Sequence, residues 1–315
     1  MRTRVAVIGG GQNCEHDVSL ASAASVAAAL DSSKYDILRL TIGADGGWRD
    51  KEERPVSFSA AIALLSSCDV ALPIVHGPRG EDGTLAALLD LVGVAYVGSG
   101  VRAGALAMDK WVTKLIAEAV GIPTAPSVLL TAASAATYAW RHPVVVKPVA
   151  AGSSHGVALV AEPADLASAL HAAFKLDDRV LVEEVITGRE IDIAVLGTAG
   201  GGRVTSPALE IAVDGLFDFD AKYGGSAPFR IPAPLNPAEE KALENAALTM
   251  YDALGCRGVA RVDFFLTAAG PVLNEVNTMP GFTPQSQVPL MFAAAGTTYA
   301  ELLDLLIGDA LADGM

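Results

Sequence analysis

The sequence is poor in the residues that mark several protein classes. Its 315 residues include only three cysteines, Cys14, Cys68 and Cys256, which are far apart and form no CxxC pair. This spacing indicates reduced thiols in a cytoplasmic protein rather than a disulfide framework. Aromatic residues make up only 6% of the chain. No apolar run approaches the roughly 18 residues that a membrane-spanning helix needs, so we expect no membrane partner.

Positive charge is also scarce. The chain has 22 Lys and Arg against 36 Asp and Glu, a formal net charge of −14. Because nucleic-acid-binding proteins carry basic patches, this balance argues against a nucleic-acid partner. A nucleotide remains compatible with it, since a nucleotide needs only a local positive site. The apolar run after Arg4 ends at Gly9–Gly11, which predicts a first strand and a turn rather than a secretory signal.

The order of the expected elements predicts more than one domain, as the length of the chain also does. Strands that alternate with helices in the first hundred residues indicate a parallel α/β unit. These strands are expected at 4–8, 35–42 and 69–75, and the helices at 19–30 and 84–91.

The remaining elements indicate two α+β units. The first would hold a helix at 105–120, strands at 144–147, 157–160 and 180–184, and a helix at 164–174. The second would hold strands at 190–196, 258–266 and 271–277, a helix at 237–254, and a long loop at 221–234 of the kind that often forms a lid. We therefore expect three domains, at 1–104, 105–187 and 188–315.

The expected hairpin at 258–277 carries the strongest local signal. Residues two apart in a strand face the same side, so Arg261, Asp263 and Phe265 share one face, and Glu275 and Asn277 share another. Pairing of the strands would bring the two faces together. Carboxylate and amide oxygens suit Mg²⁺, so the hairpin predicts a magnesium site. The alternative is a solvated face with a surface ion pair.

Two lysines and a group of glutamates suggest a nucleotide site. Lys147 ends an apolar strand and precedes the small-residue loop 150–156, whose N–H groups could hold phosphates. No Walker motif is present. Lys110 could act in the same way, and Glu183 and Glu190 could bind adenine and ribose. Surface positions are the alternative for all four residues.

The segments after the first and third strands offer a weaker signal. Glu15 could cap a helix or could pair with a substrate ammonium group. His76 and the Glu81–Gly83 segment could serve only as turn residues.

Taken together, the motifs resemble those of the D-alanine–D-alanine ligases of the ATP-grasp superfamily, in the same order from about residue 5 to 305. The motifs are GGGQNCEHDVSL, VHGPRGEDGT, YVGSG with AMDK, VVVKP with GSSHG, LVEE with GRE, FDFDAKY, and GVARVDFFL with LNEVNTMPGFTPQS. The resemblance implies an ATP-grasp fold of mixed α/β and α+β class, with an N-terminal parallel α/β domain that binds substrate. It also implies ligation of two D-alanines through an acyl phosphate, for peptidoglycan precursor synthesis.

The resemblance further implies roles for individual residues. ATP would be bound by Lys110, Lys147, Ser153, Glu183, Ile186, Glu190, Phe265 and Asn274. Two Mg²⁺ ions, with Mn²⁺ as a substitute, would be bound by Asp263, Glu275 and Asn277. Lys222 would assist the transferred phosphoryl group.

The two D-alanine molecules would occupy neighbouring subsites. Glu15 would pair with the ammonium of the first, near His76, and Ser153 and Tyr223 would complete a hydrogen-bonded set that closes the 221–234 loop. Arg261 and the N–H of Gly281 would form the oxyanion hole, and Ser286 and Gln287 would receive the carboxylate of the second D-alanine. The resemblance also implies a homodimer.

The sequence departs from the family pattern at three places. Ala86 and Ala87 stand where the family usually has Gln-Gly, Gln287 replaces an apolar residue, and the loop after Tyr223 is short and lacks acidic residues. These departures leave open a related ligase with D-lactate, D-serine or another amino acid as acceptor. A silent nucleotide- or amino-acid-binding regulator on the same fold is a further alternative, which the intact metal-site residues disfavour.

Overall fold

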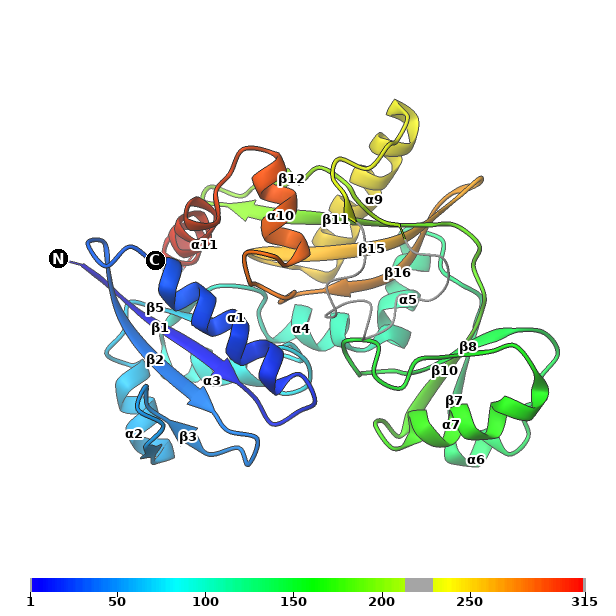
Figure 1. Ribbon diagram of the computed structural model, residues 1–315, viewed down its shortest axis with the longest axis horizontal. Coiled ribbons are helices and arrows are strands. Elements are labelled where there is room, and N and C mark those ends of the chain that lie inside the picture. Colours follow the sequence, from blue (N-terminus) through cyan, green and yellow to red (C-terminus); the bar gives the residue numbers. More distant parts are fainter. Residues whose placement is uncertain (1, 213–228, 314–315) are drawn as a thin grey trace.

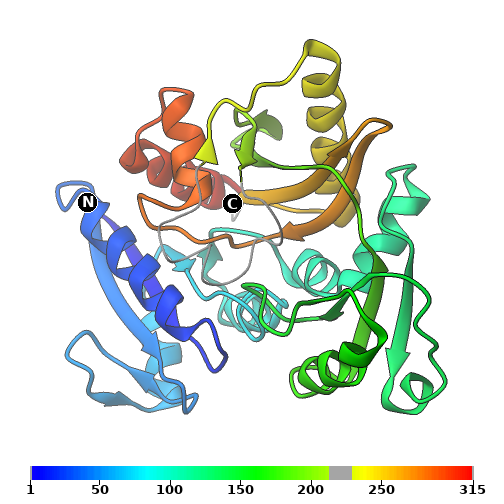
Figure 2. The same cartoon turned by 45° about the vertical axis from the view of Figure 1, so that its right-hand side comes forward.

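The computed structural model describes residues 2–212 and 229–313, which form three β-sheets with helices packed around them. Figures 1 and 2 both place the first sheet and the second sheet at opposite ends of the molecule, with the third sheet above and between them. The pocket described below lies between the second and third sheets.

The first sheet confirms the expected parallel α/β unit in four of its strands, and the other two, β3 and β4, add an antiparallel edge that the sequence did not predict. Its strand order is β4-β3-β2-β1-β5-β6, and β1 pairs in parallel with both β2 and β5. Successive residues of β1 face opposite sides, so Val5 and Val7 pack with α1 while Ala6 and Ile8 pack on the other side. The elements are β1 (Thr3–Gly10), α1 (His16–Ala29), β2 (Tyr35–Ile42), β3 (Trp48–Arg49), β4 (Pro55–Val56), α2 (Phe58–Leu65), β5 (Val70–Pro73), α3 (Thr84–Val92) and β6 (Ala95–Tyr96).

The second sheet has the order β7-β10-β8-β9, and its neighbouring strands run antiparallel. Alternation along β8 sends Val144 and Val146 into the core, while Val145 and Lys147 line the pocket. The elements are β7 (Ser127–Thr131), α6 (Ala132–Ala135), β8 (Val144–Pro148), β9 (Ala158–Val160), the 3-10 helix η1 (Pro163–Asp165), α7 (Leu166–Phe174) and β10 (Arg179–Glu184).

The prediction of a single helix at 105–120 is wrong. The structure has two helices, α4 (Val101–Met108) and α5 (Lys110–Ala119), separated at Asp109. Asp109 has an extended backbone, and its carboxylate accepts a hydrogen bond from the N–H of Val112 and pairs with Arg179 at 2.7 Å. The break places Lys110 at the first position of α5, beside the pocket.

The third sheet has the order β14-β13-β11-β15-β16, with β12 paired to β11. The helix expected at 237–254 is confirmed as α9, because Asn236 and Glu239 form a capping box at its start and Gly255 ends it in the left-handed conformation. The elements are β11 (Arg189–Thr198), β12 (Gly202–Thr205), β13 (Leu209–Ile211), β14 (Phe229–Arg230), α9 (Pro237–Leu254), β15 (Val259–Thr267), β16 (Gly270–Asn277), α10 (Gln287–Ala294) and α11 (Tyr299–Asp313).

The loop expected at 221–234 is only partly described. Phe229 and Arg230 form β14, which pairs with β13, so this part is a strand rather than a loop. Residues 221–228, with Lys222 and Tyr223, lie outside the described residues.

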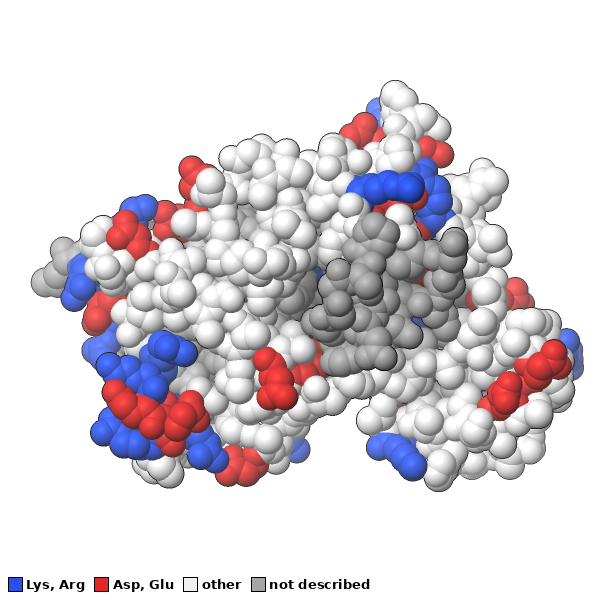
Figure 3. Space-filling view, in the orientation of Figure 1, with Lys and Arg blue, Asp and Glu red and all other residues white. Residues whose placement is uncertain are grey.

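Among residues 2–212 and 229–313, no single helix is long and apolar enough to cross a membrane. Taken together, α10 and α11 are long and apolar enough by length and composition alone, but the two helices meet at a bend of 103°. On the face seen in Figure 3, charged side chains of both signs gather over the region of β3. The ion pairs between residues 45 and 54 account for this mixture.

Candidate active site

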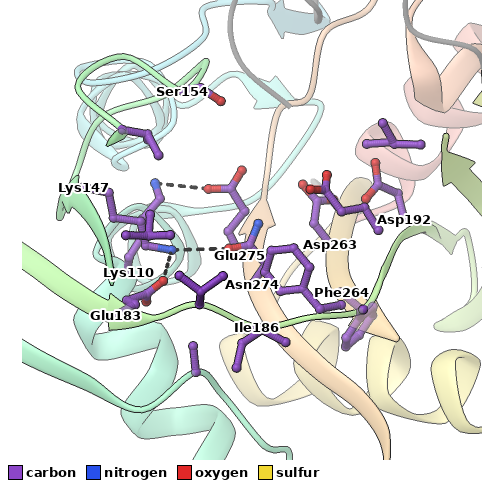
Figure 4. A pocket seen from close by; sticks show the side chains of 18 of the residues that line it. Lys110, Lys147, Ser154, Glu183, Ile186, Asp192, Asp263, Phe264, Asn274 and Glu275 are labelled. Atoms are coloured by element: carbon purple, nitrogen blue, oxygen red, sulfur yellow. Dashed lines mark hydrogen bonds and ion pairs between the residues drawn. The ribbon is translucent and has the colours of Figure 1, made fainter. Parts of the chain in front are cut away.

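A pocket of about 380 Å³ lies between the second and third sheets. Its walls come from β8, the loop 151–157, the segment that joins β10 to β11, the β15–β16 hairpin and the start of α10. Twelve of the residues selected from the sequence line it: Lys110, Lys147, Ser153, Glu183, Ile186, Glu190, Arg261, Asp263, Phe265, Asn274, Glu275 and Gln287. In Figure 4, Lys110 and Lys147 lie on one side of Glu275, and Asp263 and Asp192 lie on the other.

Glu183 binds two buried lysines. Its Oε2 lies 2.8 Å from the Nζ of Lys147, and its Oε1 lies 2.7 Å from the Nζ of Lys114. Burial alone would raise the pKa of Glu183, but the charges of Lys147 and Lys114 hold it below its ordinary value. Glu183 is therefore ionised at neutral pH. Because both of its oxygens face lysines, an adenine contact by this side chain stays a prediction.

Lys110 and Lys147 both face the β15–β16 hairpin. Lys110 Nζ donates to the backbone oxygen of Ala151 at 2.8 Å and lies 3.2 Å from Glu275 Oε2. Lys147 Nζ lies 3.3 Å from Asn274 Oδ1. Two ammonium groups thus point into one pocket from two different elements, an arrangement suited to phosphate.

The hairpin brings together the polar residues expected there. Asp263 pairs with Glu275 across the strands, and Arg261 pairs with Asn277. The register then shifts between Asp263 and Phe264, which leaves Asn274 as an extra residue on β16. This bulge explains why the sequence neighbours Asn274 and Glu275 both line the pocket, which strict alternation would not allow.

The carboxylates of the hairpin are ion-paired. Asp263 accepts two hydrogen bonds from Arg261, both at 2.7 Å, and one from the amide of Asn277 at 3.0 Å. Burial alone would lower the pKa of Arg261, but the carboxylates of Asp263 and Asp192 raise it above its ordinary value. Arg261 is therefore a fixed positive charge at the end of the pocket away from the lysines.

The hairpin also supplies oxygen ligands of the types that Mg²⁺ prefers. Across the part of the chain that the structure describes, no group of three or more His, Cys, Asp or Glu is placed to hold a metal ion. Asp263 and Glu275 nevertheless face each other beside the amide of Asn277. Mg²⁺ commonly takes one or two carboxylates and completes its shell with phosphate oxygens and water, so two carboxylates and an amide fit it.

Asp192 is a pocket residue that sequence analysis missed. It pairs with Asp263 across β11 and β15, and its Oδ2 lies 3.6 Å from Arg261 Nε. The same oxygen accepts a hydrogen bond from Gln287 Nε2 at 2.9 Å. Asp192 could have been found from the sequence, because it lies two residues after Glu190 and the two side chains therefore share the pocket face of one strand.

Glu15 is buried near the loop 151–157. Its Oε1 accepts a hydrogen bond from the hydroxyl of Ser153, and its Oε2 is buried with no hydrogen-bond partner among residues 2–212 and 229–313. Gly77 and Gly152 both lie close to this oxygen. A Cβ added to Gly77 would lie 2.5 Å from it, and a Cβ added to Gly152 would lie 2.1 Å from it. Glu15 occupies the N-cap position of α1, but its side chain makes no capping hydrogen bond there.

The same loop has a strained backbone. Ser153 and Ser154 are both left-handed, with φ of 49° and 57°. This conformation is unfavourable for residues other than glycine and persists only where the surrounding structure holds it. The hydrogen bond from Ser153 to Glu15 is one of the contacts that hold it.

His76 joins the N-terminal unit to the segment 279–282. Its Nδ1 lies 2.8 Å from the backbone oxygen of Met279, and its Nε2 lies 3.1 Å from Ser22 Oγ. Burial lowers the pKa of His76, which favours the neutral ring. The carbonyl of Met279 requires a proton on Nδ1, so Nε2 accepts from Ser22. Both ring nitrogens are therefore used within the protein, and a direct substrate contact by His76 stays a prediction.

Glu81 holds the same segment from a second side. It accepts hydrogen bonds from the N–H groups of Gly77 at 2.7 Å and Met279 at 3.0 Å. Burial and the nearby carboxylate of Glu15 raise the pKa of Glu81 to about 8. Ser22 also accepts a hydrogen bond from the N–H of Phe282. The segment that contains Gly281 is thus fixed by Ser22, His76 and Glu81.

The expected acceptor residues lie at the start of α10. Ser286 Oγ accepts from the N–H of Thr283 at 3.0 Å, and a Cβ added to Gly281 would lie 3.3 Å from it. Gln287 lines the pocket, whereas Gly281, Ser286 and Asn277 lie outside its lining, as do Glu15 and His76. Lys222 and Tyr223, outside the described residues, have no structural test.

Comparison with known proteins identifies the family. The model of the D-ala D-ala ligase C-terminus matches residues 116–308, and that of the D-ala D-ala ligase N-terminus matches residues 4–62 and 49–99. A D-alanine–D-alanine ligase of Corynebacterium glutamicum is 40% identical, over 98% of this chain and 97% of its own. That of Corynebacterium urealyticum is 39% identical, over 97% of both chains.

Solved structures agree with this identification. The VanG D-Ala:D-Ser ligase of Enterococcus faecalis has a TM-score of 0.85 at 34% identity, over 98% of this chain and 99% of its own. The D-alanine–D-alanine ligase of Bacillus anthracis complexed with ATP has a TM-score of 0.80 at 30% identity, over 99% of this chain and 98% of its own. The chain therefore belongs to the D-ala D-ala ligase family and has the ATP-grasp fold of that family.

Proposed function

We propose that the protein joins two molecules of D-alanine into D-alanyl-D-alanine for peptidoglycan precursor synthesis, with cleavage of ATP to ADP and phosphate. The observation that carries the proposal is the pocket itself, where Lys110 and Lys147 face the acidic hairpin across a space lined by apolar side chains. The family relationship over nearly the whole chain supports the choice of substrate.

ATP would lie with its phosphates between the lysines and the hairpin. A phosphate oxygen would replace Glu275 as the partner of Lys110, and Lys147 would turn toward it from Glu183. Ile186 and Phe265 would contact the adenine, and Glu190 the ribose. Mg²⁺, as two ions for which Mn²⁺ could substitute, would neutralise the phosphates when held by Asp263, Glu275 and Asn277.

The first D-alanine would bind at Glu15. The buried Oε2, which has no partner within the described part of the chain, is suited to an ammonium group, because an unpaired buried carboxylate oxygen is costly. Ser153 orients the carboxylate through Oε1, and Tyr223 would complete this set. The carboxylate of this D-alanine would then point toward the phosphates and be converted to an acyl phosphate, with Lys222 assisting.

The second D-alanine would attack the acyl phosphate with its amine as a free base. Arg261 and the N–H of Gly281 would stabilise the tetrahedral oxyanion, and Ser286 and Gln287 would hold the carboxylate of the second D-alanine. The segment that contains Gly281 is held by Ser22, His76 and Glu81, so this donor is fixed before substrate binds. Exclusion of water would protect the acyl phosphate from hydrolysis.

D-Serine is a second candidate acceptor. The hydrogen-bonded pair of Gln287 and Asp192 makes the acceptor end polar, and a D-Ala:D-Ser ligase is among the similar structures. A panel of D-alanine, D-serine and D-lactate as acceptors, each with D-alanine and ATP, tests both candidates. Dominant turnover with D-alanine alone supports the main proposal, whereas a preference for D-serine or D-lactate contradicts it.

Three further expectations belong to the same proposal. The domain boundaries at 1–104, 105–187 and 188–315 stay a prediction, and each of these ranges contains one of the three sheets. The three free cysteines support a cytoplasmic location. The homodimer rests on the family relationship.

A further inference from the structure

Lys114 is a buried cation that takes no part in the mechanism proposed above. It lies on α5, four residues after Lys110, so both lysines project from one face of the helix. Only 3% of Lys114 is exposed, against 5% for Lys147 and 5% for Glu183. The three side chains form one cluster, in which each oxygen of Glu183 binds one lysine at 2.7 Å or 2.8 Å.

The charges of this cluster decide what Lys147 can do. Two ammonium groups and one carboxylate leave one net positive charge. Without Lys114, Lys147 and Glu183 would form a neutral pair. A phosphate could then bind Lys147 only if Lys147 left Glu183, whose buried carboxylate would have no partner. Such an unpaired buried charge is strongly unfavourable. With Lys114 present, Glu183 keeps a partner when Lys147 turns to the phosphate.

We propose that Lys114 is a positioning residue for nucleotide binding. It stays paired with the carboxylate of Glu183 and thereby leaves the charge of Lys147 available to a phosphate. This inference rests on the proposed assignment of Lys147 to the ATP phosphates. It predicts an effect on ligands that carry phosphates and none on the nucleoside alone.

The test is calorimetric binding of Mg-ATP and of adenosine in the absence of D-alanine. Lys114→Met keeps an unbranched side chain but removes the charge, and we expect it to weaken ATP binding about tenfold or more, since a hydrogen bond to a charged group is at stake. Adenosine affinity should stay within about twofold, as for changes remote from a ligand. Lys241→Met, an exposed lysine on α9, is the matched control.

A double variant separates charge from structure. Lys114→Met with Glu183→Gln again leaves one net positive charge at Lys147, so we expect it to bind ATP more tightly than Lys114→Met does. Equal loss of ATP and adenosine binding in Lys114→Met, or no recovery in the double variant, would overturn the inference. If Lys114→Met does not fold, the double variant decides: ATP affinity clearly above that of Lys147→Met supports the inference, and affinity as weak as that of Lys147→Met refutes it.

Lys147→Met also separates this inference from the proposed function. Unchanged ATP affinity in Lys147→Met would remove the phosphate assignment of Lys147 itself. Weaker ATP binding in Lys147→Met together with normal binding in Lys114→Met would leave that assignment standing and refute the role of Lys114 alone.

Discussion

Gln287 Nε2 donates a hydrogen bond to Asp192 Oδ2 at 2.9 Å, which ties the first residue of α10 to β11. The same carboxylate oxygen lies 3.6 Å from Arg261 Nε. The end of the pocket that would receive the second substrate is therefore polar and is held by contacts among α10, β11 and β15.

Gln287→Leu should shift the choice of acceptor. The change removes the hydrogen bond to Asp192 and offers an apolar surface, so we expect the use of D-serine to fall relative to D-alanine. The measurement is kcat/KM for both acceptors. Gln285→Leu, at an exposed position two residues earlier, is the control. Identical acceptor ratios in wild type and Gln287→Leu would show that this side chain does not shape the acceptor site.

Glu275→Gln should abolish most turnover while the fold survives. The change keeps the size of the side chain but removes a charge next to Lys110 and opposite Asp263. We expect turnover to fall by about 10²-fold or more, as when a group that stabilises transition-state charge is removed. Turnover is measured at saturating Mg²⁺, with thermal unfolding alongside and the exposed Glu240→Gln on α9 as control. Near-normal turnover would contradict the assignment of Glu275 as a metal ligand.

Glu15→Gln should weaken the binding of the first D-alanine. The carboxylate has one buried oxygen that no described residue hydrogen-bonds, and a neutral amide cannot pair with an ammonium group. We expect the KM for the first D-alanine to rise about tenfold or more, since a charge-assisted contact is lost, with ATP affinity unchanged. Asp17→Asn, at an exposed position in the first turn of α1, is the control. A parallel loss of ATP affinity would indicate a general structural defect instead.

Glu81 should make the free energy of unfolding depend on pH. Its pKa is about 8 in the folded protein against an ordinary 4.5, so the protonated form stabilises the fold. This contribution is complete below pH 4.5 and is lost as pH rises toward 8, by at most about 1.4 kcal/mol per pH unit. Between pH 7 and 8 His76 adds little, because burial lowers its pKa below the ordinary 6.5 and the ring is mostly neutral in both states there.

Urea unfolding of wild type and Glu81→Gln from pH 7 to 9 checks this prediction. The neutral amide cannot titrate, so the difference in unfolding free energy should move in favour of Glu81→Gln up to about pH 8 and then level off. A difference that does not vary with pH would mean that Glu81 is already ionised at pH 7.

The sequence predicted those features that depend on local pattern. Asn236, Glu239 and Gly255 bound α9 through local capping, and alternation along two strands brought Asp263 and Glu275 together. Other features depend on residues distant in the chain. The break at Asp109 is held by Arg179, seventy residues away, and Glu183 binds Lys114, which no strand or loop pattern marks.

The most direct test of the account is the stoichiometry of the reaction with D-alanine as the only amino acid. The purified protein is incubated with Mg-ATP and D-alanine, and nucleotides, phosphate and dipeptide are quantified together. The account predicts ADP, phosphate and D-alanyl-D-alanine in equal amounts, with no dipeptide when ATP is left out. Formation of AMP and pyrophosphate, or the absence of nucleotide turnover, would contradict it.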